Sequence, residues 1–395
     1  MLVTRILGDC PGCGGKNRFG NVSIRGDYVL RGCMSCKYST KVWLPEIRKK
    51  IIYLDQFFFS HAFKGRDQRF VDTAQRIAQL AAMQLLVVPY SSIHEDETHQ
   101  WRGYDGKNKE DLMEFIKATS RGHEFKPEYN VEQTQIIRAF QRFLAGGSPE
   151  FQLEDHDAIK GDIHEWDDYF RIDVGRYIGD IELKRKLKRQ AVKGLVDIFE
   201  SWRQSTNTFD QDVALEITAA GKGYIDSYLE FVVRISGGDY AAVFNSPVMS
   251  QVVQSMLHCI PKETPPEEHL RQAARFFVSD HFTQIPREWL SARMYATQKD
   301  YVKHGAFPNR ENALQDLSGF FYDVTHVSTY APYCDAFVMD KAMAHLVADK
   351  RVGLEERYGV EIFSLNNWDE LYTWLDAIEA GMTEEHKAGL SAAYS

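Results

Sequence analysis

Four cysteines near the start of the chain restrict its fold more than any other feature. The pattern Cys-x2-Cys-x19-Cys-x2-Cys is typical of a tetrahedral zinc site with four thiolate ligands. Two strands are expected between the pairs, at 19–25 and 27–31, so residues 1–45 are predicted to form a small β zinc ribbon. With four protein ligands the ion has no open position and is expected to be structural. The ligands are Cys10, Cys13, Cys33 and Cys36.

Disulfides are the alternative for these cysteines, but nothing in the sequence indicates export, and cytosolic thiols stay reduced. Residues 1–9 lack the apolar stretch and cleavage site of a signal peptide. No segment approaches the roughly 20 consecutive apolar residues that a membrane helix needs. A cytoplasmic protein without a membrane partner is therefore expected.

Charge is distributed unevenly along the chain. Ten basic and three acidic residues give positions 1–50 a net charge of +7. The net charge of the whole chain is −9, so the remaining residues together carry −16. Such asymmetry indicates an interaction module attached to a differently charged body. Zinc ribbons contact nucleic acid or protein, and both kinds of partner stay open.

Strand and helix patterns alternate on both sides of a long helical stretch. Apolar runs at 51–55 and 85–88 are typical of buried strands, and 70–83 between them has helical spacing. A helix over 314–321 and strands at 335–340 and 360–364 return to this alternation, which is typical of a parallel sheet flanked by helices. The predicted fold class is therefore α/β, with four parts: the ribbon at 1–45, an α/β domain at 46–120 and 306–395, and a helical insertion at 121–305.

Acidic residues follow the expected strands. Asp55 ends the first strand and Asp340 ends a later one, and ligands of open α/β sheets gather at the carboxyl ends of strands. Glu97 lies about two helical turns beyond the second strand and can point back to the same edge, with Glu95 as the competing residue. Four or five carboxylates this close would repel one another, so a divalent cation is expected between them.

Two further acids belong to the same hypothesis. Asp323 shares a helix face with His326. Asp335 precedes its strand and reaches the site only if that turn lies on the functional edge. Oxygen ligands suit Mg²⁺ or Mn²⁺, and such ions hydrolyse phosphodiesters. His94 and His326 are expected to be buried, hydrogen-bonded residues rather than ligands.

These motifs resemble those of PIN-domain nucleases. The run 51–55 looks like the first strand, whose terminal acid is the central metal ligand, and 89–97 is similar to the second motif, in which a helical glutamate binds metal. The segments 323–326 and 332–340 look like the third and fourth acidic motifs. The resemblance implies a PIN-like endonuclease, on RNA more than on DNA, with catalytic Asp55, Glu97, Asp323, Asp335 and Asp340, of which Asp55, Glu97, Asp335 and Asp340 bind Mg²⁺ or Mn²⁺.

The chain departs from the PIN pattern in two places. Nearly 200 residues separate the second and third motifs, and Asp340-Lys341 replaces the usual Thr-x-Asp, which leaves the fourth role open between Asp335 and Asp340. The ribbon and the insertion are expected to select the substrate or a regulatory protein partner.

Three other classes of protein are alternatives to the nuclease. A non-catalytic zinc-ribbon adaptor for nucleic acid or protein is the main alternative. A primase-like or topoisomerase-like enzyme is disfavoured because no Asp-x-Asp follows the second strand. A P-loop is absent, since 219–223 lacks both the strand and the spacing.

Overall fold

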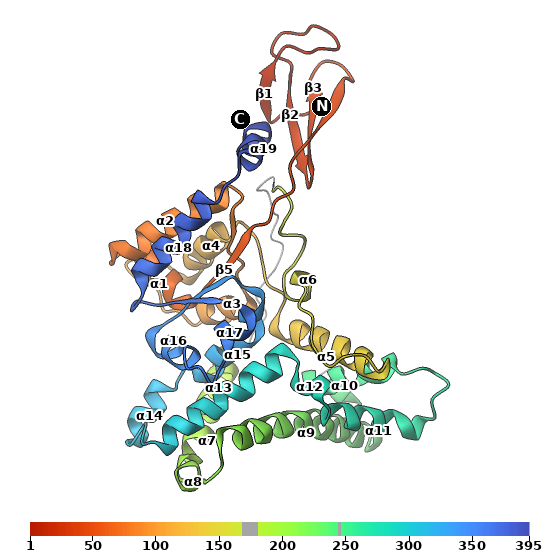
Figure 1. Cartoon of the computed structure of the whole chain (residues 1–395), viewed down its shortest axis with the longest axis vertical. Coiled ribbons are helices and arrows are strands. Elements are labelled where there is room, and N and C mark those ends of the chain that lie inside the picture. The colour runs from red at the N-terminus through yellow and green to blue at the C-terminus, as the bar shows by residue number, and fades with distance from the viewer. Residues whose placement is uncertain (168–180, 244–245, 395) are drawn as a thin grey trace.

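The protein has an α/β fold with two separate sheets (Figure 1). The computed structural model describes residues 1–167, 181–243 and 246–394. The N-terminal sheet is antiparallel, in the order β1-β2-β3-β4, and projects from the rest of the molecule. This confirms the expected small N-terminal β module, although two of its strands were not predicted. Its strands are β1 (Arg5–Gly8), β2 (Phe19–Arg25), β3 (Tyr28–Cys33) and β4 (Ser39–Trp43).

The second sheet is parallel, in the order β6-β5-β7-β8, as the alternating pattern predicts. Central strand β5 pairs with β7 in a register that sets Leu54 beside Val338. The ribbon precedes β5 in the chain and therefore lies toward the amino edge of this sheet, while the carboxyl edge faces away from it. Its strands are β5 (Lys50–Leu54), β6 (Leu86–Val87), β7 (Ala336–Val338) and β8 (Glu361–Phe363).

Helices cover both faces of the parallel sheet, because side chains alternate along each strand. Ile52 and Leu54 pack in one core and Ile51 and Tyr53 in the other. The first core is closed by α1 (Gln56–Lys64), α2 (Gln68–Ala82), α4 (Lys109–Thr119) and α18 (Trp368–Ala380). The second includes residues of α3 (Ser92–His99), α15 (Phe320–Tyr330), α16 (Lys341–Val347), α17 (Leu354–Tyr358) and the 3₁₀ turn η2 (Ala331–Tyr333).

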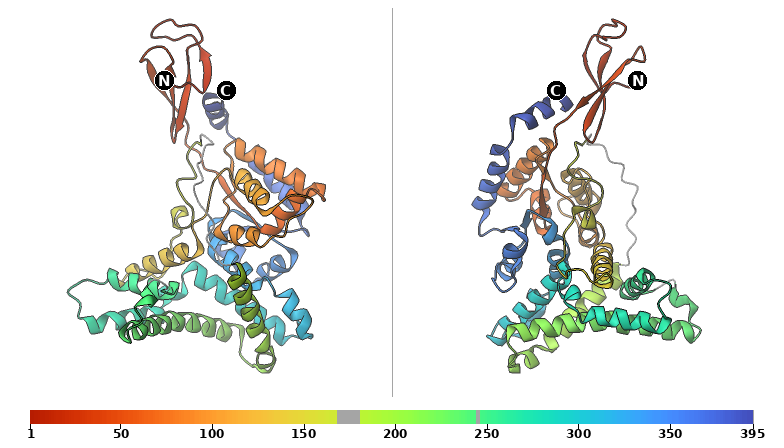
Figure 2. Two further views of the ribbon diagram at one scale, coloured as in Figure 1. Left: turned by 180° about the vertical axis from the view of Figure 1, so that it is seen from behind. Right: turned by 45° about the vertical axis from the view of Figure 1, so that its right-hand side comes forward.

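A helical layer lies between β6 and β7 in the chain and forms the end of the molecule opposite the ribbon (Figures 1 and 2). Part of it has its own apolar core, which contains Phe140, Tyr224 and Phe276. The helices are α5 (Glu128–Leu144), α6 (Asp155–Ala158), α7 (Ile181–Asp197), α8 (Phe199–Gln204), α9 (Phe209–Ser236), α10 (Val248–Cys259), α11 (Pro266–Phe277), α12 (Asp280–Thr283), α13 (Pro286–Lys303) and α14 (Arg310–Asp316), with the 3₁₀ turn η1 (Tyr240–Val243).

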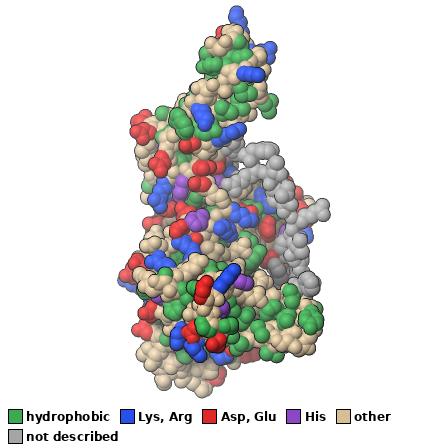
Figure 3. All heavy atoms as spheres, turned by 90° about the vertical axis from the view of Figure 1, so that its right-hand side faces the viewer, with side chains coloured by type: hydrophobic (Ala, Val, Ile, Leu, Met, Phe, Trp, Pro, Cys, Tyr) green, Lys and Arg blue, Asp and Glu red, His purple; other side chains and the backbone are tan. Residues whose placement is uncertain are grey.

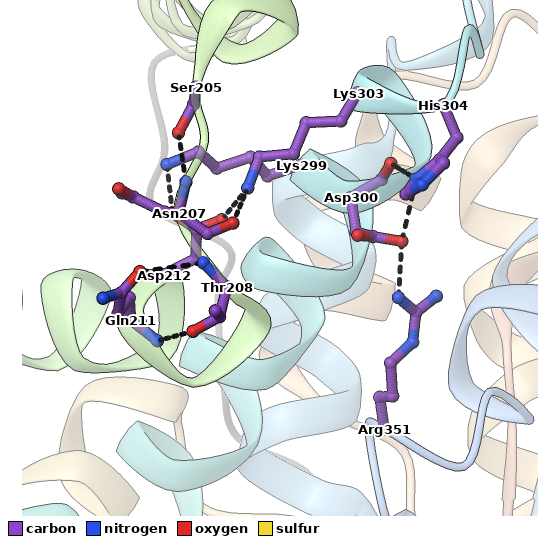
Figure 4. A network of polar contacts seen from close by, with 10 residues as sticks. All are labelled: Ser205, Asn207, Thr208, Gln211, Asp212, Lys299, Asp300, Lys303, His304 and Arg351. Carbon is purple, nitrogen blue, oxygen red and sulfur yellow. Dashed lines mark hydrogen bonds and ion pairs between the residues drawn. The ribbon is translucent and has the colours of Figure 1, made fainter.

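Helix α13 joins this layer to the α/β body through ion pairs on two of its sides (Figure 4). Lys299 and Lys303 both reach Asp212 near the start of α9, and that carboxylate is almost fully buried. Asp300 pairs with Arg351, which lies beyond α16 in the body. Removing one partner of a buried ion pair destabilises a protein by several kcal/mol, because the other charge is left buried and unpaired. These contacts therefore fix α9 against α13.

The C-terminal helix α19 (Glu384–Tyr394) packs on the ribbon (Figure 2). Asn21 donates a hydrogen bond to the carbonyl of Ala393 at 3.0 Å, and Arg31 donates one to the carbonyl of Ala392 at 3.0 Å. The two ends of the chain therefore stabilise each other.

Candidate metal centres

The four cysteines of the ribbon converge on one point. All four Sγ atoms lie within 4.8 Å of one another, with 3.7 Å between Cys10 and Cys36 and 3.9 Å between Cys13 and Cys33. Four atoms held tetrahedrally about 2.3 Å from a zinc ion are about 3.8 Å apart. A disulfide needs about 2.05 Å, so these distances exclude one. The cluster could therefore hold a structural zinc ion.

Backbone amides stabilise these thiolates. Gly12 donates to Cys10 at 3.4 Å, Ser35 to Cys33 at 3.2 Å and Tyr38 to Cys36 at 3.4 Å. Burial raises the pKa of Cys33, but hydrogen bonds from the amides of Ser35 and Cys36 and from the side chains of Cys10 and Cys36 together lower it to about 6. The donor set is that of a soft, tetrahedral site.

Asp55 and Asp340 lie at the carboxyl ends of neighbouring strands. Because Leu54 stands beside Val338, the two acids extend from strands about 4.8 Å apart. Asp55 caps α1 by accepting from the amide of Gln56 at 2.8 Å, and Asp340 caps α16 by accepting from Met343 at 2.9 Å. Each cap uses one carboxylate oxygen, and within the described residues neither acid pairs with a lysine or an arginine.

Glu97 is carried to this edge by α3. Ser91 caps that helix and donates its amide to Nδ1 of His94 at 3.0 Å, so Nε2 of His94 carries the proton and donates to the carbonyl of Leu54 at 2.8 Å. Burial raises the pKa of Tyr53, and the charges of Asp55 and Glu97 raise it further. His94 is therefore the buried, hydrogen-bonded residue that the sequence predicts.

The buried imidazole of His94 should make stability depend on pH. Burial lowers its pKa from 6.5 to about 3. Between these two pH values His94 is therefore protonated in the unfolded chain but neutral in the folded chain. Stability is therefore lost as pH falls from 6.5 toward 3, by about 2 kcal/mol between pH 7.5 and pH 5.0. Urea unfolding at both pH values measures this loss, and His94→Gln should reduce it. An equal loss in the variant would contradict the assignment.

Asp323 and His326 lie on the same face of α15. This helix runs back from the carboxyl edge and leads into the amino end of β7, so its first turn, with Asp323, lies at the acidic edge. His326 is 2% exposed, its Nδ1 lies 3.8 Å from Oδ1 of Asp55, and its Nε2 has no hydrogen-bond partner in the part of the chain that the structure describes. A Cβ at Gly319 would stand 2.9 Å from Oδ2 of Asp323, so the glycine gives that carboxylate room without a shift of its side chain.

The structure does not bring Asp335 to the other acids. It stands at the amino end of β7, where it accepts from the amide of Ile51 at 2.8 Å and pairs with Lys50 at 2.6 Å. The full length of the strand separates this carboxylate from Asp340. The turn before β7 therefore lies on the edge opposite the expected site, and of the two candidates for the fourth role only Asp340 has a suitable position.

The carboxylates at the carboxyl edge of the parallel sheet lie further apart than the thiolates of the cysteine cluster. Among the described residues, the four cysteines are the one group of three or more His, Cys, Asp or Glu whose ligand atoms all lie within 4.8 Å. Mg²⁺ keeps several of its waters and is usually held through one or two carboxylates, so a magnesium site does not require three carboxylates in mutual contact. Asp55 and Asp340, with an uncommitted oxygen each, fit a hydrated hard cation.

A cationic and aromatic face of the ribbon was not singled out from the sequence. Tyr28 and Trp43 are register partners with ring centroids 5.5 Å apart, and Nζ of Lys41 lies 4.1 Å from the Tyr28 ring centroid. Trp43 is 65% exposed. The sequence could have predicted part of this face, because Lys41 and Trp43 are two residues apart on one strand and therefore point to the same side of the sheet. Lys and Arg outnumber acidic side chains on the side of the ribbon in Figure 3.

Comparison with known proteins identifies no relative: no family model matches the chain, and neither a curated protein nor a solved structure is significantly similar to it. No helix in the described segments combines the length and the apolar character needed to cross a bilayer.

Proposed function

We propose that the protein is a PIN-like nuclease that hydrolyses phosphodiester bonds with Mg²⁺ or Mn²⁺ at the carboxyl edge of the parallel sheet. The observation that carries the proposal is the contrast between acids on the two edges. Asp335 at the amino edge is neutralised by Lys50, whereas Asp55 and Asp340 at the carboxyl edge pair with no lysine or arginine among the described residues. Carboxylates on adjacent strands repel each other, and a bound cation would relieve that repulsion.

Asp55 and Asp340 would hold the ion, with Glu97 and Asp323 binding it directly or through its waters. A bound divalent ion supplies Lewis-acid stabilisation of the phosphate and lowers the pKa of water. The chain's contribution is positioning: His94 fixes α3 on β5, and Gly319 leaves room for Asp323.

The proposed substrate is a single-stranded nucleic acid, RNA before DNA, held partly by the ribbon. Bases stack on exposed aromatic rings at a gain of about 1–3 kcal/mol each, and nearby cations attract the backbone. Tyr28, Lys41 and Trp43 offer both features on one face. Because the ribbon lies toward the opposite edge of the sheet from Asp55, it would select and tether the strand rather than take part in cleavage.

Trp43→Ala should weaken binding of single-stranded RNA by about 10-fold, through the loss of one stacking surface. Fluorescence anisotropy with a labelled oligonucleotide measures the change. Tyr129→Ala is a matched control, since Tyr129 in α5 is 46% exposed and lies outside the ribbon. Equal affinities for Trp43→Ala and the wild type would remove the ribbon face from the proposal.

Cleavage itself is tested by incubating labelled single-stranded RNA and DNA with the zinc-loaded protein. Products are expected with Mn²⁺ and none with a chelator that leaves the ribbon's zinc in place. Cleavage that does not respond to added metal would contradict the proposal.

A zinc-ribbon adaptor is the second candidate. It is favoured by one observation: Asp55 and Asp340 already serve as helix caps, which alone would account for both residues. The adaptor predicts that nucleic-acid or protein binding is unaffected when Mn²⁺ is withheld and that no cleavage occurs.

A further inference from the structure

Helix α9 carries an exposed stripe with the spacing of a coiled-coil seam. The helix is 28 residues long and lies at the end of the molecule opposite the ribbon (Figures 1 and 2). Exposed residues recur along one side at intervals that alternate between four and three, so that every second one is seven residues further on, as in the heptads of two packed helices. The stripe consists of Leu215, Ala219, Lys222, Asp226, Leu229 and Val233.

The stripe is apolar at both ends and charged in the middle. Leu215 is 52% exposed, Leu229 46% and Val233 69%, whereas Lys222 and Asp226 form an exposed ion pair at the centre. Further exposed apolar residues, Val232 in α9 and Tyr240 and Val243 in η1, extend it at the C-terminal end. Contiguous exposed apolar surface of this kind marks an interaction site.

The sequence of the stripe is symmetric about position 224. Leu215 and Val233 are each nine residues from it, Ala219 and Leu229 five, and Lys222 and Asp226 two. In an antiparallel pair of α9 helices related by a two-fold axis at this level, every apolar residue meets an apolar residue. Lys222 of each copy meets Asp226 of the other. In a parallel pair, Lys222 would face Lys222 and Asp226 would face Asp226, so like charges would repel each other.

We propose that α9 binds a second copy of this chain in antiparallel orientation and makes the protein a two-fold symmetric dimer. An isologous interface requires a self-complementary surface, and the stripe is one in both apolarity and charge. Its central residues include Ala219, and helices with small side chains at the contact approach to about 8–10 Å. The helix is held rigidly, because Asp212 in its first turn is buried against Lys299 and Lys303.

The proposed dimer has two consequences. One helix pair about 42 Å long is a small interface, so the dimer should dissociate in the micromolar range. Because the ribbon lies at the far end of the molecule from α9, the two ribbons would point away from each other and leave both free to bind.

Analytical ultracentrifugation of the full chain between about 1 and 100 μM tests this proposal. The wild type should show a concentration-dependent dimer. Lys222→Asp and Asp226→Lys should each be monomeric over this range, because like charges then meet at the two-fold axis. The double variant should dimerise again, and an equimolar mixture of the two single variants should form a heterodimer, since their stripes are complementary.

Ile6→Asp is the control, because Ile6 is 53% exposed but lies in β1 of the ribbon, far from α9, and it should dimerise like the wild type. A wild type that stays monomeric to about 100 μM would overturn the proposal. So would single charge variants that dimerise as tightly as the wild type, or a mixture that stays monomeric. Helix content by circular dichroism should be equal in all these proteins.

Discussion

Asp55→Asn should lower the rate of metal-dependent RNA cleavage by at least about 100-fold while leaving the fold intact. Asparagine is as good a helix cap as aspartate, so the hydrogen bond from the amide of Gln56 can be kept. What the substitution removes is the negative charge that a divalent cation requires. The variant therefore separates the two roles that the position allows, the cap and the metal ligand.

Initial rates with Mn²⁺ and thermal unfolding of the same samples measure the two effects. Asp335→Asn is the matched control, because it also removes one carboxylate charge but at the amino edge. It should cleave at close to the wild-type rate. Loss of the exposed ion pair with Lys50 should lower the free energy of unfolding by no more than about 1 kcal/mol. Equal rates for Asp55→Asn and the wild type would remove Asp55 from catalysis.

Cys33→Ser should unfold the ribbon and release its zinc. The ribbon's apolar core is small, with Val29 as its fully buried residue, so metal binding must supply most of its stability. Structural zinc contributes about 10–16 kcal/mol in small domains of this kind. The α/β body has separate cores and should stay folded. We expect α19 to loosen with the ribbon, because Asn21 and Arg31 hold its last turn.

Zinc content and hydrogen exchange measure this outcome. Wild-type protein should contain one zinc per chain and Cys33→Ser none, with fast exchange confined to the ribbon and α19. Cys259→Ser, which changes a free cysteine outside the cluster, should keep the metal. A protected ribbon in zinc-free protein would contradict the account.

Local patterns predicted the elements well where one physical rule dominated. The Cys-x2-Cys pairs specify the metal cluster by spacing alone, and the continuous apolar run at 51–54 specifies β5, a strand buried on both faces. His94 was correctly expected to be buried. These features depend on residues that are close in sequence or on a ligand geometry that fixes them.

Features that depend on direction or on distant contacts were not predicted. Asp335 and Asp340 flank one short strand, but they lie on opposite edges of the sheet, and only the acid after the strand is at the carboxyl edge. The expected helix at 314–321 is broken between Asp316 and Phe320, where Gly319 makes room for Asp323. The packing of α19 on the ribbon joins residues more than 360 apart, which no local pattern encodes.

The central claim is that the carboxyl edge holds a divalent cation, and Mn²⁺ binding followed by electron paramagnetic resonance tests it most directly. The zinc-loaded wild type should bind Mn²⁺ at this edge, Asp335→Asn should bind it equally, and Asp55→Asn and Asp340→Asn should bind it at least about 10-fold more weakly. Equal Mn²⁺ binding by all four proteins, or none by the wild type, would contradict the account.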